Sequence, residues 1–299
     1  MKRIFSILAA ALIIFGAASC KKSSKGDPEA PKTTFAIAVS DITDGNCSFT
    51  IIPSDNTVEY MLVFMKKADL GSDLVKTMKD YLASDQYTYE KYKTDGCITK
   101  DQTIRTETPY GLSANTQYVL VVFQIDKDLN ISGNVTASEP FYTLPENYFD
   151  LGLPSGTIWN FYNVKNPNHT GGLWTWDEAM AYSLPSYASI PTNEQWLELI
   201  NNCDWSWDDT YKFWRVRSRK NSTNYIVIAT DGNGECGTTD VYHKGEYSFY
   251  WSSTVVEWSS EGNAWAYIGS KSDYKNYEEE FSKCTPLALR LVAANPNKK

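Results

Sequence analysis

Hydrophobic and polar positions alternate along several short segments in the first half of the chain. A β-strand places successive side chains on opposite faces, so this alternation predicts half-buried strands rather than helices. A glycine-containing turn at residues 44–46 separates the first two segments, and Pro53 ends the second. The predicted strands are residues 35–39, 47–51, 60–64, 118–125 and 141–143.

The period changes between residues 73 and 84. The apolar side chains there recur every three to four residues, which places them on one face of a helix. They are Leu74, Val75, Met78, Tyr81 and Leu82. We therefore expect one amphipathic helix inserted among the strands of the first half.

Two helix starts are encoded in the second half. Residues 175–178 (TWDE) and 192–195 (TNEQ) both match the capping box, in which two side chains three positions apart satisfy free backbone N–H groups. After the second box, Trp196, Leu199 and Ile200 fall on one helical face, which indicates a core-facing stripe. Farther on, two strands joined by a polar turn are predicted at residues 213–218 and 225–229.

The N-terminus has the pattern of a secretory signal. A basic start precedes a largely apolar run over residues 4–18, which is shorter than the roughly 20 residues of a membrane-spanning helix. Residues 17–20 (AASC) resemble a bacterial lipobox, whose cysteine is acylated and becomes the mature N-terminus. The resemblance makes Cys20 the lipidation site. It implies a lipid anchor at the bacterial outer membrane, on the cell surface or the periplasmic face.

The composition divides the rest of the chain. Residues 21–32 (KKSSKGDPEAPK) have too few apolar side chains to bury a core, and all ten tryptophans lie between Trp159 and Trp265. The sharp onset of tryptophan predicts a domain boundary at residues 144–147 (LPEN). The predicted order is a signal peptide (1–19), a tether (20–32), a first domain (33–145) and a second domain (146–295).

Residues 110–118 (YGLSANTQY) resemble a signature of fibronectin type III domains. The resemblance covers roughly residues 33–144 and implies a β-sandwich, here with one inserted helix. In that family the tyrosine of the signature forms a corner, because its hydroxyl bonds back to the backbone. Tyr118 would take that structural role.

The second half resembles the family named after the major paralogous domain of Fibrobacter, which is common in lipoproteins of Bacteroidetes. The opening segment FDLGLPSGTIW carries the strongest likeness, and four further segments follow in the family's order. The resemblance implies a C-type-lectin-like α+β fold, related also to formylglycine-generating enzymes. The fold class expected for the whole chain is therefore mostly β, with an α+β C-terminal part. The matching segments are residues 149–159, 190–196, 202–207, 250–254 and 289–292.

Charge and cysteine usage exclude several functions. The chain has 28 basic and 36 acidic residues, which makes a nucleic-acid partner a poor fit. Neither CxxC nor HExxH occurs, so a zinc site would have to be assembled from distant positions. Acylation of Cys20 leaves an odd number of cysteines, so at least one thiol of a monomer stays unpaired. Their pairing is open among Cys47, Cys97, Cys203, Cys236 and Cys284.

Tryptophans are the first candidates for a binding surface, because exposed indole rings stack on sugars. Trp159, Trp196 and Trp251 sit among apolar neighbours inside the family segments, so we expect them to be buried structural residues. Trp214 and Trp258 have polar neighbours and are predicted to be exposed ligand-binding rings. The polar groups expected beside them are Arg215, Arg217 and Glu257.

Two further patterns carry candidate chemistry. Asp231, Asn233 and Glu235 place oxygen ligands at alternate positions, as calcium loops do, although an ordinary turn explains the same residues. Calcium is thus an open alternative to having no cofactor. Arg215 and Arg217 alternate along one strand face, which is either a solvated face or a site for acidic sugars.

These observations favour a non-catalytic binding lipoprotein that presents a lectin-like head to a glycan or protein at the cell surface, as in adhesion. A structural or assembly subunit of a surface structure is the alternative, and an enzyme of unknown type comes third. Formylglycine-generating enzymes use a close cysteine pair, whereas Cys236 and Cys284 lie far apart in sequence. No carboxylate is marked out for acid–base work, so we expect no enzyme.

Overall fold

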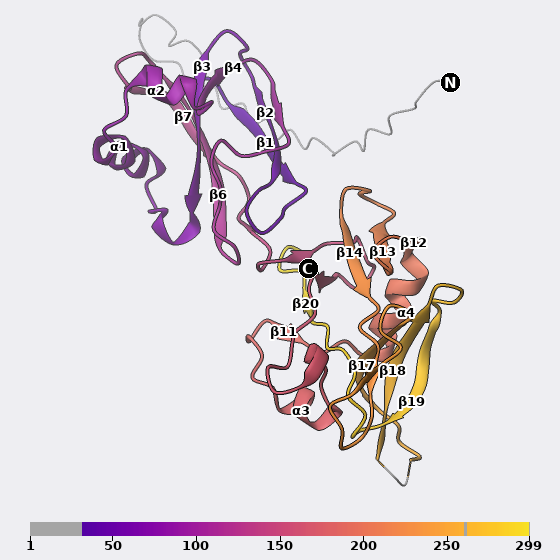
Figure 1. Cartoon of the computed structure of the whole chain (residues 1–299). Coiled ribbons are helices and arrows are strands. Elements are labelled where there is room, and N and C mark those ends of the chain that lie inside the picture. Colours follow the sequence, from indigo (N-terminus) through magenta and orange to yellow (C-terminus); the bar gives the residue numbers. More distant parts are fainter. Residues whose placement is uncertain (1–31, 260–261, 299) are drawn as a thin grey trace, which may run out of the picture. The chain divides into compact units, whose positions relative to one another are not determined.

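Antiparallel sheets make up most of the regular structure in the computed structural model, which describes residues 32–259 and 262–298 (Figure 1). The mostly-β prediction is confirmed. Cys20, the predicted signal peptide and nearly all of the predicted tether lie outside the described residues. Within the described ranges, no helix has the length and apolar character needed to cross a membrane.

The first half contains two antiparallel sheets. Strands β1, β2 and β5 form one, and β4, β3, β6 and β7 form the other in that order, with β8 pairing to β6. The strands predicted from alternation are all present. The elements are β1 (Phe35–Ser40), β2 (Ser48–Pro53), β3 (Glu59–Lys66), η1 (Lys67–Asp69), α1 (Leu74–Ser84), α2 (Tyr89–Thr94), β4 (Ile98–Lys100), β5 (Thr103–Arg105), β6 (Gln117–Ile125), β7 (Ile131–Ala137) and β8 (Phe141–Tyr142).

The two sheets of the first half share one hydrophobic core. Phe49 and Ile51 of β2 pack in the same cluster as Leu62 of β3 and Leu120 of β6. Tyr118 is buried at the edge of this cluster, and its hydroxyl accepts a hydrogen bond from the Ser113 N–H at 3.1 Å. The bond back to the backbone expected of Tyr118 is therefore confirmed.

Strands β3 and β6 are buried on their other face as well, where α1 and α2 lie (Figure 1). Burial on both faces explains why these two strands read as nearly continuous apolar runs. α1 begins after Asp73, whose carboxylate accepts from the Lys76 N–H, and it buries Met78. The expectation of a single inserted helix is wrong, because α2 buries Tyr89 and Tyr92 beside it.

The second half combines two α-helices with four small sheets. The sheet orders are β11-β20-β10-β9, β12-β13-β14, β15-β16 and β17-β18-β19. The elements are β9 (Tyr148–Phe149), β10 (Thr157–Asn160), η2 (Thr170–Gly172), α3 (Trp176–Ala181), β11 (Ala188–Ser189), α4 (Asn193–Asn202), β12 (Cys203–Asp208), β13 (Phe213–Ser218), β14 (Tyr225–Ala229), β15 (Asn233–Gly234), β16 (Val241–Tyr242), β17 (Tyr247–Val255), β18 (Asn263–Ser270), β19 (Asn276–Ser282) and β20 (Val292–Ala294).

Both predicted capping boxes form. Thr175 caps α3 with Glu178, and Thr192 caps α4 with Gln195, each pair exchanging side-chain and backbone hydrogen bonds. The predicted core stripe of α4 is buried, led by Trp196, which stacks on a tyrosine of β18. The structural tryptophans Trp159, Trp196 and Trp251 are all fully buried, as expected.

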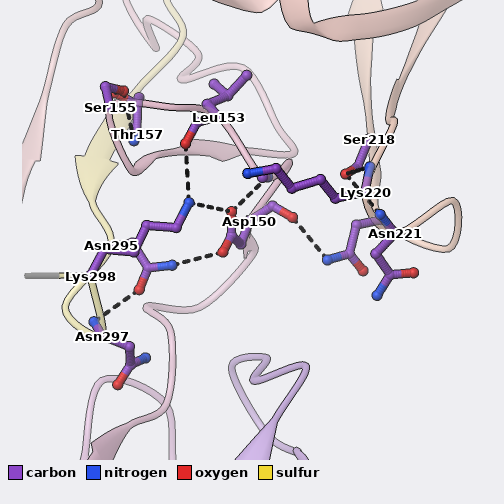
Figure 2. A network of polar contacts seen from close by, with 12 residues as sticks. Asp150, Leu153, Ser155, Thr157, Ser218, Lys220, Asn221, Asn295, Asn297 and Lys298 are labelled. Atoms are coloured by element: carbon purple, nitrogen blue, oxygen red, sulfur yellow. Dashed lines mark hydrogen bonds and ion pairs between the residues drawn. The ribbon is translucent and has the colours of Figure 1, made fainter. Parts of the chain in front are cut away.

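The opening segment of the second half is held by a polar network around Asp150 (Figure 2). Its carboxylate accepts from the Gly152 N–H at 2.7 Å and from the Asn295 amide at 2.8 Å, and Lys298 Nζ lies 3.6 Å away. Its backbone carbonyl accepts from the Asn224 amide at 2.9 Å. The hydrogen-bonding groups of the network are thus paired within the protein. The network has a structural role, because it connects the start of this half, its end and the β13–β14 turn.

Two glycines of the same segment have a backbone reason to be there. Gly152 and Gly156 have φ values of 73° and 79°, in the left-handed region that side chains with a Cβ rarely adopt. The turn they form lets the Gly152 N–H reach the Asp150 carboxylate. The segment is thus a tight, internally bonded turn leading into β10.

The hydrophobic clusters divide near the predicted boundary, except that Leu144 of the predicted first domain packs with the second half. Two clusters draw their buried residues from Phe35 to Phe141. The other two draw theirs from Leu144 to Ala293. The division into two domains between residues 145 and 146 stays a prediction. The separation of the hydrophobic cores supports it.

Candidate ligand-binding cleft

The β12-β13-β14 sheet has one core face and one open face. Register pairs Arg215 of β13 with Val227 of β14 and with Ser206 of β12, so these three side chains share the open face. Trp214 pairs with Trp207 and Ile228 and points to the core face. The sheet therefore directs its indole rings toward the core and its arginines toward the open face.

Trp214 corrects one prediction. Its side chain is only 6% exposed, it belongs to the core of the second half, and its indole N–H donates to the Ser270 carbonyl at 3.1 Å. The physical reason is the two-residue period of the strand. If Arg215 and Arg217 face solvent, the residues between and beside them, Trp214 and Val216, must face inward. The predicted exposure of Trp214 is wrong, and it cannot stack on a ligand.

A cleft of about 610 Å³ opens over the solvent face of this sheet. Strands β13 and β14 supply its floor, and the irregular segment after β10 supplies a wall. We call it the Arg215 cleft. Its lining residues are Phe161, Tyr162, Asn163, Lys165, Phe213, Arg215, Tyr225, Val227, Ala229, Asp231 and Arg290.

Aromatic rings form a row along the Arg215 cleft. The Arg215 guanidinium lies over the Phe213 ring at 5.8 Å and over the Tyr225 ring at 5.4 Å. Tyr225 contacts Phe161 edge-on at 5.8 Å, and Phe161 contacts Tyr162 at 5.0 Å. Tyr162 is 59% exposed, so the row ends in an accessible ring.

Asp231 connects the polar side chains on one side of the cleft by hydrogen bonds. One carboxylate oxygen accepts from Lys165 Nζ at 2.7 Å and from the Asn163 amide at 2.7 Å. The same Asn163 amide group lies 2.9 Å from the Tyr250 hydroxyl. Burial raises the pKa of Tyr250, while the charge of Arg290 acts in the opposite direction, so this phenol is a neutral hydrogen-bonding group.

Arg290 lies beneath the cleft and is 1% exposed. Its guanidinium donates to the backbone carbonyls of Asn160, Phe161 and Val227. Within the described part of the chain, no carboxylate lies at ion-pairing distance from it. A buried cation whose hydrogen bonds all go to neutral carbonyls keeps its positive charge uncompensated.

Three buried polar atoms of residues that line the cleft lack a hydrogen-bond partner. They are Asn163 Oδ1, Arg215 Nε and Arg290 Nε. Buried polar groups are nearly always satisfied in folded proteins, so exceptions mark places where water, an ion or a ligand completes the bonding. Because three of these atoms belong to one cleft, we take this cleft as the candidate binding site.

The predicted calcium loop does not assemble around an ion position. Asp231 turns to Lys165, whereas Glu235 accepts from the Tyr242 hydroxyl and Asn233 donates to the Gly234 carbonyl. Among residues 32–259 and 262–298, no three acidic, cysteine or histidine side chains are grouped as metal ligands would be. The three side chains have separate partners in this structure, and calcium stays an open alternative.

Trp258 is exposed as predicted, at 73%. Its ring meets Trp265 edge-on at 5.6 Å, and its indole N–H donates to Glu280 at 3.2 Å. Glu257 beside it is also exposed. This surface is separate from the lining of the Arg215 cleft, and its role in binding stays a prediction.

Cys236 and Cys284 form a disulfide, which sequence spacing did not indicate. The bond fixes the loop that follows Asp231 to the segment before β20. The remaining described cysteines, Cys47, Cys97 and Cys203, are free and buried. Burial raises the pKa of Cys47 and of Cys203 to about 12, so both are inert thiols that act as core side chains.

Sequence reasoning found part of this cleft. Arg215 and Asp231 come together in it, whereas Arg217 is exposed on the same strand outside the lining. The residues it missed come from the segment 161–165, from Tyr225 and from Arg290. Alternation along β14 was a usable signal for Tyr225, but nothing local pointed to segment 161–165.

A comparison of the chain with family models, curated proteins and solved structures found no match.

Proposed function

We propose that this chain is a non-catalytic, membrane-anchored binding lipoprotein whose second half binds a glycan in the Arg215 cleft. The fibronectin-type resemblance of the first half and the lectin-like resemblance of the second support a stalk that presents a binding head. The anchor follows from the lipobox at Cys20. The location that goes with it is the outer membrane, at the cell surface or its periplasmic face.

One observation carries the choice of a glycan. The Arg215 cleft combines a row of aromatic rings with charged and amide groups that have unsatisfied atoms. A sugar ring gains apolar burial when its C–H face stacks on an aromatic ring, and its hydroxyls then need polar partners at the rim. Tyr162 and Tyr225 offer the ring faces, and Asn163, Asp231 and Lys165 offer the partners.

The lining also favours binding over hydrolysis. Glycoside hydrolysis uses a pair of carboxyl groups on either side of the scissile bond. The lining residues of the cleft include one carboxylate, Asp231, and it is already bonded to Lys165 and Asn163. The arrangement suits recognition of hydroxyl groups rather than proton transfer to a leaving group.

A glycan array tests the proposal, with residues 21–299, the mature chain without its lipidated cysteine, as the probe. Tyr162→Ala removes an exposed ring of the cleft and should weaken binding by about 1–2 kcal/mol, roughly tenfold, without loss of stability. Tyr142→Ala, an exposed tyrosine of β8, is the matched control and should bind as the parent does. If no glycan binds, the glycan proposal is wrong and an assembly role replaces it.

The anchor has its own test. Only a thiol can accept the diacylglycerol, so Cys20→Ala should abolish incorporation of a labelled fatty acid when the protein is made in a bacterial host. Cys236→Ala, which removes another thiol of the chain, should still be labelled. Unchanged labelling of the Cys20→Ala protein would overturn the assignment.

A further inference from the structure

We infer that the glycan bound in the Arg215 cleft is acidic, a linear oligosaccharide whose anionic group pairs with Arg215. The inference rests on the proposed function and specifies the class of ligand. It is carried by the charges of the cleft, by their positions relative to the aromatic row, and by the unsatisfied donors of both arginines.

The cleft is cationic on a chain that is otherwise acidic. The whole chain has a formal net charge of −8, yet the lining contains Lys165, Arg215 and Arg290 against the single carboxylate Asp231. Lys165 and Asp231 pair at 2.7 Å and largely cancel one another. The charge left over in the cleft is therefore that of the two arginines.

Neither arginine has a close, hydrogen-bonded carboxylate partner among the described residues. Arg215 forms a longer ion pair with Asp208, whose Oδ2 lies 3.6 Å from Nη2, beyond the length of a direct charge-assisted hydrogen bond. Arg290 donates to backbone carbonyls and lies 5.7 Å from the centre of the Tyr250 ring, and the Nε atoms of both arginines have no partner. A cleft with low-dielectric walls focuses such uncompensated charge and attracts anions into it.

Arg215 is also placed where a sugar acid would need it. Its guanidinium is fixed between the Phe213 and Tyr225 rings, and its side chain is 37% exposed. Guanidinium groups bind carboxylates and other oxyanions through two parallel N–H donors. A sugar that stacks on a neighbouring, uncovered ring of the row would place an acidic substituent within reach of Arg215.

The aromatic row extends past the cleft, which indicates a chain of several sugar rings. Tyr211 stacks on Phe213 at 6.0 Å with nearly parallel planes and is 73% exposed. At the other end lies Tyr162, 59% exposed. Arg215 stands between the two exposed ends, so stacking positions are available on both sides of the anionic group.

The test uses matched pairs of immobilised oligosaccharides. Uronate oligomers are compared with their methyl esters, and sulfated oligomers with their desulfated forms, so that charge is removed while the rings remain. We expect the mature chain to bind the acidic member of a pair at least about tenfold more tightly than its neutral counterpart. Comparison of the uronate pairs with the sulfated pairs shows whether the cleft recognises a carboxylate or a sulfate.

Two arginine variants separate the site from general charge attraction. Arg215→Gln should lower the affinity for the acidic oligomer roughly 10- to 100-fold. Arg217→Gln removes the same charge from the next exposed position of β13, outside the cleft, and should leave the affinity unchanged. Equal losses in both variants would overturn the inference, as would binding of neutral oligomers that Arg215→Gln does not affect.

The outcomes also distinguish this inference from the proposed function. If neutral glycans bind, with loss in Tyr162→Ala but not in Arg215→Gln, the cleft is a glycan site and the acidic ligand is wrong. If no glycan of either kind binds, both fail together. Tyr211→Ala adds a length test, because it should weaken binding of long oligomers and leave that of a single acidic sugar unchanged.

Discussion

At the scale of single residues, the two tryptophans that were predicted to be exposed have opposite environments. Trp214 is 6% exposed and hydrogen-bonded to Ser270, whereas Trp258 is 73% exposed. Trp214→Ala should lower the free energy of unfolding by about 3–5 kcal/mol, because it leaves a cavity in the core. Trp258→Ala should change it by less than about 0.5 kcal/mol. Denaturant unfolding of both variants checks this, and comparable losses would contradict the assigned burial.

Tyr118 contributes through a single hydroxyl. In Tyr118→Phe the Ser113 N–H loses its acceptor while the ring stays packed, so the free energy of unfolding should fall by about 1–2 kcal/mol. Tyr142→Phe, on an exposed ring, is the control and should leave stability within about 0.5 kcal/mol. Unfolding curves that coincide for the two variants would show that the corner bond does not stabilise the first half.

At the scale of elements, the sequence predicted the features that depend on residues close together in the chain. The capping boxes at Thr175 and Thr192 and the bounds of β13 and β14 follow from local side chains, and all are present. α2 was missed because its six residues are too few to show a helical period. Segment 161–165 was missed because tertiary packing, rather than any local pattern, brings it over the open face of the sheet.

The disulfide joins the β15–β16 loop, which contains Cys236, to the segment between β19 and β20, which contains Cys284. Cys236 and Cys284 are both exposed, so a reductant can reach the bond in the folded protein. Opening it frees a loop of 48 residues in the unfolded chain and should cost about 2–4 kcal/mol of stability. Calorimetry with and without reductant measures this, and the Cys236→Ser, Cys284→Ser double variant should match the reduced protein.

Thiol counting provides the control for that experiment. The free cysteines Cys47, Cys97 and Cys203 are buried, and burial raises the pKa of each thiol. A thiol reagent at mild alkaline pH should therefore find almost no reactive group in the native oxidised chain without Cys20. Two groups should appear after mild reduction. Rapid labelling of the buried thiols before reduction would show that the cores open more readily than their packing implies.

At the scale of the whole molecule, the separation of the hydrophobic clusters is the feature with the clearest consequence. The buried residues of the first-half clusters end at Phe141, and those of the second-half clusters begin at Leu144. Every residue that lines the Arg215 cleft comes from the second half, between Phe161 and Arg290. A stalk and a head that fold separately would therefore leave all of the binding chemistry in the head.

The corresponding prediction concerns two fragments, residues 33–145 and 146–299. Each has its own core, so each should unfold cooperatively when expressed alone, and the melting of the full chain should resemble the two fragments combined. The second fragment should bind glycans with the affinity of the mature chain, whereas the first should bind none. If neither fragment melts cooperatively, the halves share a core and the predicted boundary is wrong. If the second fragment folds but binds weakly, the first half takes part in recognition and is more than a stalk.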